Sequence, residues 1–120
     1  MNERAEQWNQ FITEICMRDR ASLNKRQRDA VICFWYDAEM QNGRHSAYFE
    51  SYPIVAPEEA ESAIRRIGGD AIADNFRKAA ETGASDAWEE TDSAYYAFLP
   101  SLSDLLTDHV ALHADEILNR

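Results

Sequence analysis

The residues best suited to chemistry in this sequence are two histidines four positions apart, His109 and His113. On a helix, side chains at this spacing share a face, so both imidazoles could reach one metal ion. The intervening Val-Ala-Leu lacks the glutamate of the zinc-protease motif H-E-x-x-H, and no third or fourth ligand is evident. Both histidines also fall within an apolar stripe. We therefore interpret them as hydrogen-bonded core residues, and a small metal-dependent enzyme is the less favoured alternative.

The rest of the sequence contains no recognisable catalytic motif. It has no nucleophile elbow, Walker loop or ordered Ser-His-Asp set. The pair Gly68-Gly69 is too short to cradle a phosphate and is better explained as the end of a helix. Neighbouring carboxylates such as Glu89 and Glu90 point in different directions on a helix, so they do not form an acid/base pair. We predict that the protein is not an enzyme and binds no metal or other cofactor.

Negative charge is concentrated in the C-terminal part of the chain. The net charge is −10, and residues 51–120 carry fourteen Asp/Glu against five Lys/Arg. From Ala79 onward, Arg120 is the only Lys or Arg, against nine carboxylates. Such a charge distribution repels nucleic acid and anionic lipid and attracts basic partners. We therefore expect no direct binding of nucleic acid or membranes. The alternative to a role in attracting basic partners is that the charge serves only solubility.

The acidic residues also have a spacing that suggests a function. On a helix, Asp104 and Asp108 lie one turn apart, with their Cβ atoms about 5–6 Å from each other, and Asp115 continues the row if the helix persists. A rigid row of carboxylates resembles the spaced charges of a nucleic-acid backbone. A basic protein surface could then bind this row in place of DNA. The predicted partner contacts are Glu89, Glu90, Asp92, Asp104, Asp108 and Asp115.

Two amphipathic segments must position these residues from the N-terminal side. Residues 3–19 have apolar residues at helical spacing, and residues 25–42 form a longer segment that is apolar nearly all round at its centre. Ser22 or Asn24 can cap the second helix. The pair Asn42-Gly43 looks like a hairpin turn, but the flanking helix formers and the segment length favour a helix that ends at a left-handed Gly43.

The remaining elements are expected to be shorter helices. A short helix at 45–52 and a loop at 52–57 lead to a helix that starts at Pro57 and stops near Ile67. Asp70 can cap the next helix, which Gly83 ends. An exposed acidic linker at 84–91, a short helix at 93–99 and a last helix from Pro100 complete the chain. The sequence thus predicts an all-α, single-domain compact bundle of about six or seven helices.

The cellular setting follows from what the sequence lacks. No apolar run approaches the ~18 residues that span a membrane, and the N-terminal MNERAEQWNQ has no apolar signal-peptide core. Cys16 and Cys33 lie among apolar residues and are interpreted as small core residues in a reducing compartment. These features predict a cytoplasmic protein.

Several motifs resemble those of one family. They are Glu39-x-x-Asn42-Gly43-x-His45-x-x-Tyr48-Phe49, the helix end Ala63-Ile64-Arg65-Arg66-Ile67-Gly68-Gly69, Asp92-x-x-Tyr95-Tyr96, and Leu105-Leu106-x-x-x-Val110-x-x-His113-x-Asp115-Glu116-Ile117. In this order they resemble the DNA-mimic-protein-19-like family, over residues 22–118 and preceded by the amphipathic N-terminal helix. Arg44 stands where the family usually has a second glycine, and Gly69 where alanine is common.

The resemblance implies an all-helical domain and, from the family's named member, an acidic homodimer that occupies the DNA-binding surface of a transcription factor. We interpret the motif residues as scaffold that ends helices and packs the core: Glu39, Asn42, Gly43, His45, Tyr48, Phe49, Gly68, Tyr95, Tyr96 and His113. Function is expected in the acidic residues. Our hypothesis is a non-enzymatic acidic protein that binds a basic or DNA-binding protein, plausibly as a DNA mimic; the alternative is an immunity or antitoxin protein that neutralises a nuclease.

Overall fold

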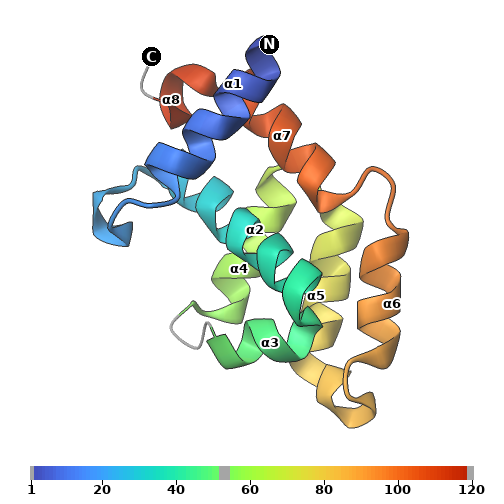
Figure 1. The fold of residues 1–120 in the computed structure, drawn as a ribbon. Coiled ribbons are helices and arrows are strands. Elements are labelled where there is room, and N and C mark those ends of the chain that lie inside the picture. Colours follow the sequence, from blue (N-terminus) through green and yellow to red (C-terminus); the bar gives the residue numbers. More distant parts are fainter. Residues whose placement is uncertain (1, 52–54, 119–120) are drawn as a thin grey trace.

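The computed structural model describes residues 2–51 and 55–118, which form an all-helical fold (Figure 1). In chain order the α-helices are α1 Glu3–Gln10, α2 Lys25–Asn42, α3 Arg44–Ser51, α4 Pro57–Arg66, α5 Asp70–Thr82, α6 Glu89–Ala97, α7 Leu102–Leu112 and α8 Ala114–Ile117. The prediction of an all-α fold is confirmed. The predicted count of six or seven helices is too low, because the described residues contain eight.

Helix α2 runs through the centre of the molecule and packs against α3, α4, α7 and α8 (Figure 1). Its start is a capping box, in which Asn24 Oδ1 accepts the Gln27 N–H at 2.8 Å and Gln27 Oε1 accepts the Asn24 N–H at 2.9 Å. The Gln27 amide also donates to the Ile117 carbonyl at 2.9 Å, which joins α2 to the end of the chain. The buried face of α2 includes Ala30, Ile32, Cys33, Tyr36 and Met40.

The end of α2 differs from the prediction in one residue. Gly43 has φ −143°, so it is not the left-handed residue. That conformation belongs to Arg44, with φ 66°, directly at the start of α3. Gly43 is required for another reason, because a Cβ at this position would lie 2.5 Å from the Ala47 Cβ. The chain therefore reverses through a close contact at Gly43 and a strained backbone at Arg44.

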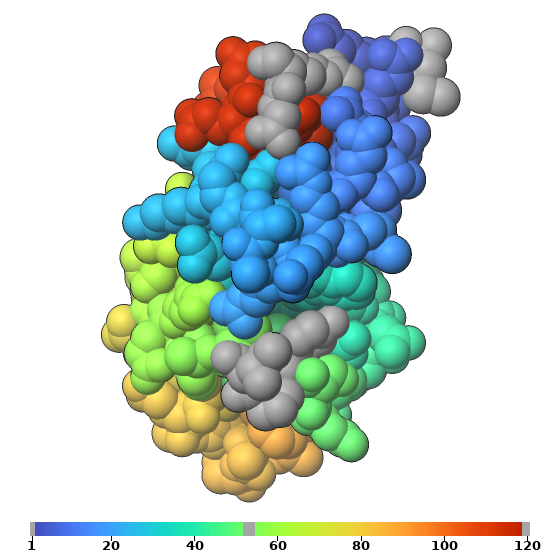
Figure 2. All heavy atoms as spheres, turned by 90° about the vertical axis from the view of Figure 1, so that its left-hand side faces the viewer, coloured from blue at the N-terminus to red at the C-terminus, as the bar shows by residue number. Residues whose placement is uncertain are grey.

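The N-terminal helix is shorter than predicted. Helix α1 continues as a π-helical turn, Phe11–Ile15, instead of reaching residue 19, and the 3₁₀ turn Arg20–Ser22 follows. Phe11 and Ile15 are fully buried, which confirms the apolar stripe. This segment packs against α7, so the two ends of the chain lie side by side at one end of the molecule (Figures 1 and 2).

Helices α4 and α5 pack closely against each other and are joined by the two glycines. Gly68 has φ 99°, and the N–H of Gly69 donates to the Ile64 carbonyl at 3.1 Å, as expected where a glycine ends a helix. Asp70 is the first residue of α5 and not its cap, because Gly69 occupies the cap position. Pro57 begins α4 as predicted. Residues 52–54 of the predicted loop lie outside the described residues.

The acidic C-terminal part is more helical than predicted. The expected linker at 84–91 contains the 3₁₀ turn Gly83–Asp86 and the start of α6. The expected last helix is interrupted at His113, where φ is −113° and ψ is 33°, and restarts as α8. Ser101 caps α7 by accepting the Asp104 N–H at 3.1 Å. None of the helices in the described ranges has the length and apolar character needed to cross a membrane.

Candidate acidic interaction surface

The predicted partner contacts lie on α6, α7 and α8, which follow one another from the right-hand side of the molecule to its upper end in Figure 1. Five of the six are exposed: Glu89, Glu90, Asp104, Asp108 and Asp115. Asp92 is the exception, because it is buried with only 6% of its surface exposed. Its assignment as a partner contact was wrong. Position in an acidic stretch does not reveal which side of α6 faces the core.

Ion pairs divide the exposed carboxylates into two groups. Asp108 pairs with Arg4 of α1, Glu90 with Lys78 of α5, and Glu116 with Arg26 of α2. The others from residue 79 onward form no ion pair within the described chain: Glu81, Asp86, Glu89, Asp104 and Asp115. We call these five residues the acidic surface. Because no lysine or arginine lies between 79 and 118, their charge is not neutralised locally.

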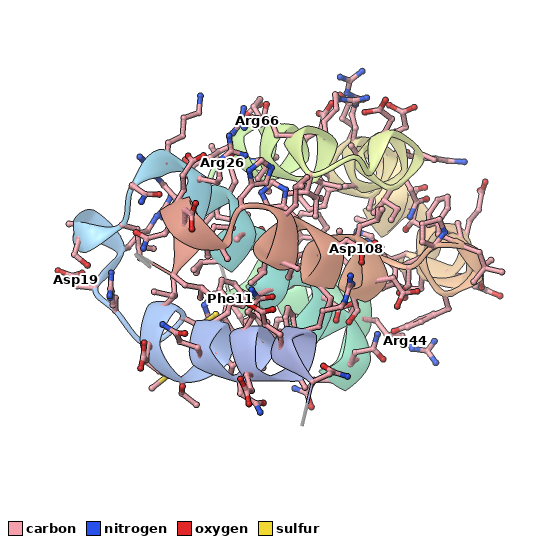
Figure 3. The ribbon with its side chains drawn as sticks, turned by 90° about the horizontal axis from the view of Figure 1, so that it is seen from above. Phe11, Asp19, Arg26, Arg44, Arg66 and Asp108 are labelled. Atoms are coloured by element: carbon pink, nitrogen blue, oxygen red, sulfur yellow. The ribbon has the colours of Figure 1, made fainter. Side chains whose placement is uncertain are left out.

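The carboxylates do not form one continuous helical row. Asp104 and Asp108 lie one turn apart on α7 as expected. The interruption at His113 places Asp115 on the separate helix α8, so the expected extension of the row to Asp115 is wrong. In Figure 3, Asp108 is seen beside the α1 segment. The residues of the acidic surface therefore lie on separate elements and do not form one row along a single helix.

Asp92 instead completes a buried hydrogen-bond network with His45 and Tyr36. The Asp92 Oδ1 accepts the backbone N–H of His45 at 3.1 Å and the ring Nδ1–H at 2.7 Å. The Tyr36 hydroxyl lies 2.6 Å from His45 Nε2. Because the carboxylate can only accept, Nδ1 carries the proton and Nε2 accepts from Tyr36. Burial lowers the pKa of His45, and the hydrogen bond that its ring donates to Asp92 opposes that shift.

Other motif residues surround this network. Tyr95 donates to Asp37 and Tyr96 to the Met40 carbonyl, so α6 is tied to α2 at two points. Tyr48 packs edge-to-face on Tyr36, with ring centroids 5.1 Å apart. The family-like motifs around His45 and around Asp92 thus meet in the interior of the molecule. One signal for this contact is present in the sequence, because each motif has a polar residue three positions before a pair of aromatic residues.

The remaining scaffold residues occupy less buried positions. The Glu39 carbonyl accepts the Gly43 N–H at 2.7 Å and closes the last turn of α2, while Asn42 is exposed. Phe49 is half-buried and stacks on Trp88, with centroids 5.9 Å apart. His113 is half-buried at the break between α7 and α8.

Trp88 positions the beginning of the acidic helix α6. Its indole N–H donates to the Ala79 carbonyl at 3.0 Å, and its ring fills the space in front of Gly83. A Cβ on Gly83 would lie 2.3 Å from Trp88 Cδ1, so only glycine fits there. Ala87 and Trp88 both have left-handed backbones, with φ 56° and 60°. This strained turn fixes the direction in which α6 begins at Glu89.

The two histidines do not assemble a metal site with other ligands. Their ring centroids are 4.7 Å apart, but no group of three or more His, Cys, Asp or Glu side chains suited to a metal occurs among the described residues. His109 is buried and its Nε2 has no hydrogen-bond partner there, so the expectation of a hydrogen-bonded core histidine is wrong for this atom. Burial, and then the neighbouring His113, lower the pKa of His109 to about 4.

Comparison with known proteins identifies one family. The family described as DMP19-like protein matches residues 21–116, which is most of the chain and includes the motifs discussed above apart from Ile117, the final residue of the last one. The matched segment begins just before α2, so α1 and the π-helical turn lie outside it. No curated protein and no solved structure matches the chain.

Proposed function

The chain belongs to the DMP19-like protein family, and we propose that it is a non-enzymatic acidic binding protein that occupies the basic nucleic-acid-binding surface of a partner protein. The observation that carries this proposal is the acidic surface. Between residues 79 and 118 there are nine carboxylates and no lysine or arginine, and eight of the nine are exposed.

The arrangement of this charge suits a partner that normally binds nucleic acid. Helices α6 and α7 are held rigidly, the first by the Tyr95 and Tyr96 hydroxyls and Trp88, the second by the cap at Ser101. Fixed carboxylates lose little conformational freedom on binding, which favours complex formation. The five unpaired members require no internal ion pair to be broken first. A basic groove that accepts phosphates can therefore accept them directly.

The proposal makes the binding sensitive to salt. Exposed charges are screened over about 8–10 Å at ordinary ionic strength, so affinity should fall steeply as salt is raised. Capture of partners from a cell lysate by the purified protein at low salt, followed by elution with duplex DNA, tests this directly. Recovery of DNA-binding proteins that DNA displaces supports the proposal, whereas recovery of none at low salt contradicts it.

Charge reversal provides a matched comparison. The triple variant Glu89→Lys, Asp104→Lys, Asp115→Lys alters three residues of the acidic surface. The control variant Glu14→Lys, Asp19→Lys, Glu50→Lys changes the net charge by the same amount at exposed carboxylates without an ion pair in the described chain. The first variant should lose the captured partner and the control should retain it. Equal loss in both variants would show that only net charge matters.

The identity of the captured partner separates the two forms of the proposal. A transcription factor or another DNA-binding regulator supports DNA mimicry. A nuclease whose activity the protein inhibits supports the immunity or antitoxin alternative, because a nuclease presents the same kind of basic surface. Addition of the purified protein to each captured partner in a DNA-binding assay and a DNA-cleavage assay distinguishes them.

A further inference from the structure

A polar cavity lies on the side of the molecule where the start of α2, the end of α4 and α7 meet α8. It has a volume of about 430 Å³ and is lined by Lys25, Arg26, Asp29, Arg66, His109 and Glu116. Viewed from above, Arg26 and Arg66 lie near each other on this side (Figure 3). The cavity thus brings together three cations in a protein whose net charge is −10.

The cations keep hydrogen-bond donors that the protein does not use. Arg66 binds Asp29 through Nε and Nη2, both at 2.7 Å, which leaves Nη1 without a hydrogen-bond acceptor among the described residues. Arg26 binds Glu116 through Nε at 2.9 Å, which leaves both of its terminal nitrogens. Lys25 forms no ion pair with any described residue. The two carboxylates are therefore satisfied while the three cations still have donors for an acceptor in the cavity.

The wall of the cavity also includes a buried polar side chain, His109, that lacks a hydrogen-bond partner among the described residues. His109 is 8% exposed, and its Nε2 forms no hydrogen bond with the described residues. A buried polar atom without a hydrogen-bond partner is unfavourable, so such atoms are uncommon in folded proteins unless a ligand or water completes them. This observation is independent of the cation cluster, and it points to a bound polar molecule at the same place.

We propose that this cavity binds a phosphate-type oxyanion, carried as the phosphate group of a small molecule, with Lys25, Arg26 and Arg66 as the donors and His109 as a further polar contact. Planar guanidinium groups match the oxygens of phosphate, and lysine adds a mobile positive charge. The volume lies within the range of small-molecule sites, about 300–1,000 Å³, and exceeds what a bare phosphate fills. Asp29 and Glu116 orient the guanidinium groups and do not occupy the free donors.

The proposal is tested by titration of the ¹⁵N-labelled protein with adenosine monophosphate and, separately, with inorganic phosphate, each at constant ionic strength. Saturable shifts should appear in the Nε–H signals of Arg26 and Arg66 and in the imidazole signals of His109. Sodium chloride at the same ionic strength should not produce them. The proposal would be overturned if no saturable shifts appeared at ligand concentrations up to about 10 mM, or if sodium chloride produced the same shifts.

Paired variants separate a specific site from general charge. Lys25→Gln with Arg26→Gln removes two of the proposed donors, and affinity should fall more than tenfold. The control, Arg18→Gln with Arg28→Gln, removes the same charge at exposed arginines that do not line this cavity. Equal losses in the two variants would contradict a specific site. Thermal melts of both variants confirm that they fold.

The source of the phosphate group follows from the same titrations. Tighter binding of adenosine monophosphate than of inorganic phosphate indicates that the cavity also holds the organic part. Equal affinity identifies the free ion as the ligand. Neither outcome depends on the acidic surface, because the variant with Glu89, Asp104 and Asp115 reversed should bind these ligands as the unmodified protein does.

Discussion

The interior position of Asp92 can be tested by its removal in the variant Asp92→Ala. The substitution deletes the acceptor of two hydrogen bonds from His45, at 2.7 and 3.1 Å, and leaves a fully buried imidazole and backbone N–H unsatisfied. A hydrogen bond to a charged group contributes about 1.5–3 kcal/mol, and a buried donor left without its partner costs about 1–3 kcal/mol. Because the two bonds share one oxygen, they do not add fully, and we expect a loss of about 3 kcal/mol.

Urea denaturation followed by circular dichroism measures this loss. With an unfolding entropy of about 2.1 cal/mol/K per residue, a 120-residue chain loses about 4 °C in Tm per kcal/mol, so Asp92→Ala should melt about 12 °C lower. The control Glu89→Ala, on the same helix but exposed, should change stability by less than about 0.5 kcal/mol. Partner capture should show the opposite order. Glu89→Ala should weaken capture because it removes a residue of the acidic surface, whereas Asp92→Ala keeps that surface and should capture the partner normally. A stability of Asp92→Ala within about 0.5 kcal/mol of the unmodified protein would refute the reasoning.

Three further substitutions or conditions give separate expectations. Arg44→Gly should stabilise the protein by about 0.5–1 kcal/mol, since φ 66° strains a residue with a Cβ and suits glycine; a urea midpoint lower than that of the unmodified protein would contradict this. Gly83→Ala should destabilise it by about 1–3 kcal/mol and shift Trp88 fluorescence, because the new Cβ would lie 2.3 Å from Trp88 Cδ1. Acidification should reduce the free energy of unfolding between pH about 6.5 and about 4, because the lowered pKa of His109 makes the unfolded chain bind its proton first. His45, whose pKa is also lowered, acts in the same direction. In the variant His109→Leu, the free energy of unfolding should fall less steeply with pH, as measured by urea titrations at several pH values.

The features that could be predicted from the sequence are those fixed by neighbouring residues. Helix α2 was predicted from its first to its last residue, because Asn24 caps it locally and its apolar residues follow one helical segment. The start of α4 at Pro57 and its end just before the glycine pair were predicted for the same reason. The left-handed residue was placed at Gly43 and not at Arg44, because propensity ranks glycine first while the close contact with Ala47 decides the actual geometry.

The features that could not be predicted depend on distant contacts. His45 and Asp92 are separated by 47 positions, and nothing in the local sequence of α6 distinguishes Asp92 from exposed neighbours such as Glu90. The polar cavity at the start of α2 likewise combines residues from four helices. No glycine or proline in the sequence indicates the break at His113. This break divides the expected row of carboxylates into two groups, one on α7 and one on α8.

The ion pair between Arg4 and Asp108 gives the N-terminal helix a role beyond packing. Helix α1 lies outside the segment that matches the family, yet it neutralises a carboxylate on α7, a helix inside that segment. A change at position 4 therefore alters the charge that α7 presents without altering any residue of α7. Arg4 thus acts as a counter-charge supplied from outside the matched segment, and its presence determines how many free carboxylates α7 presents.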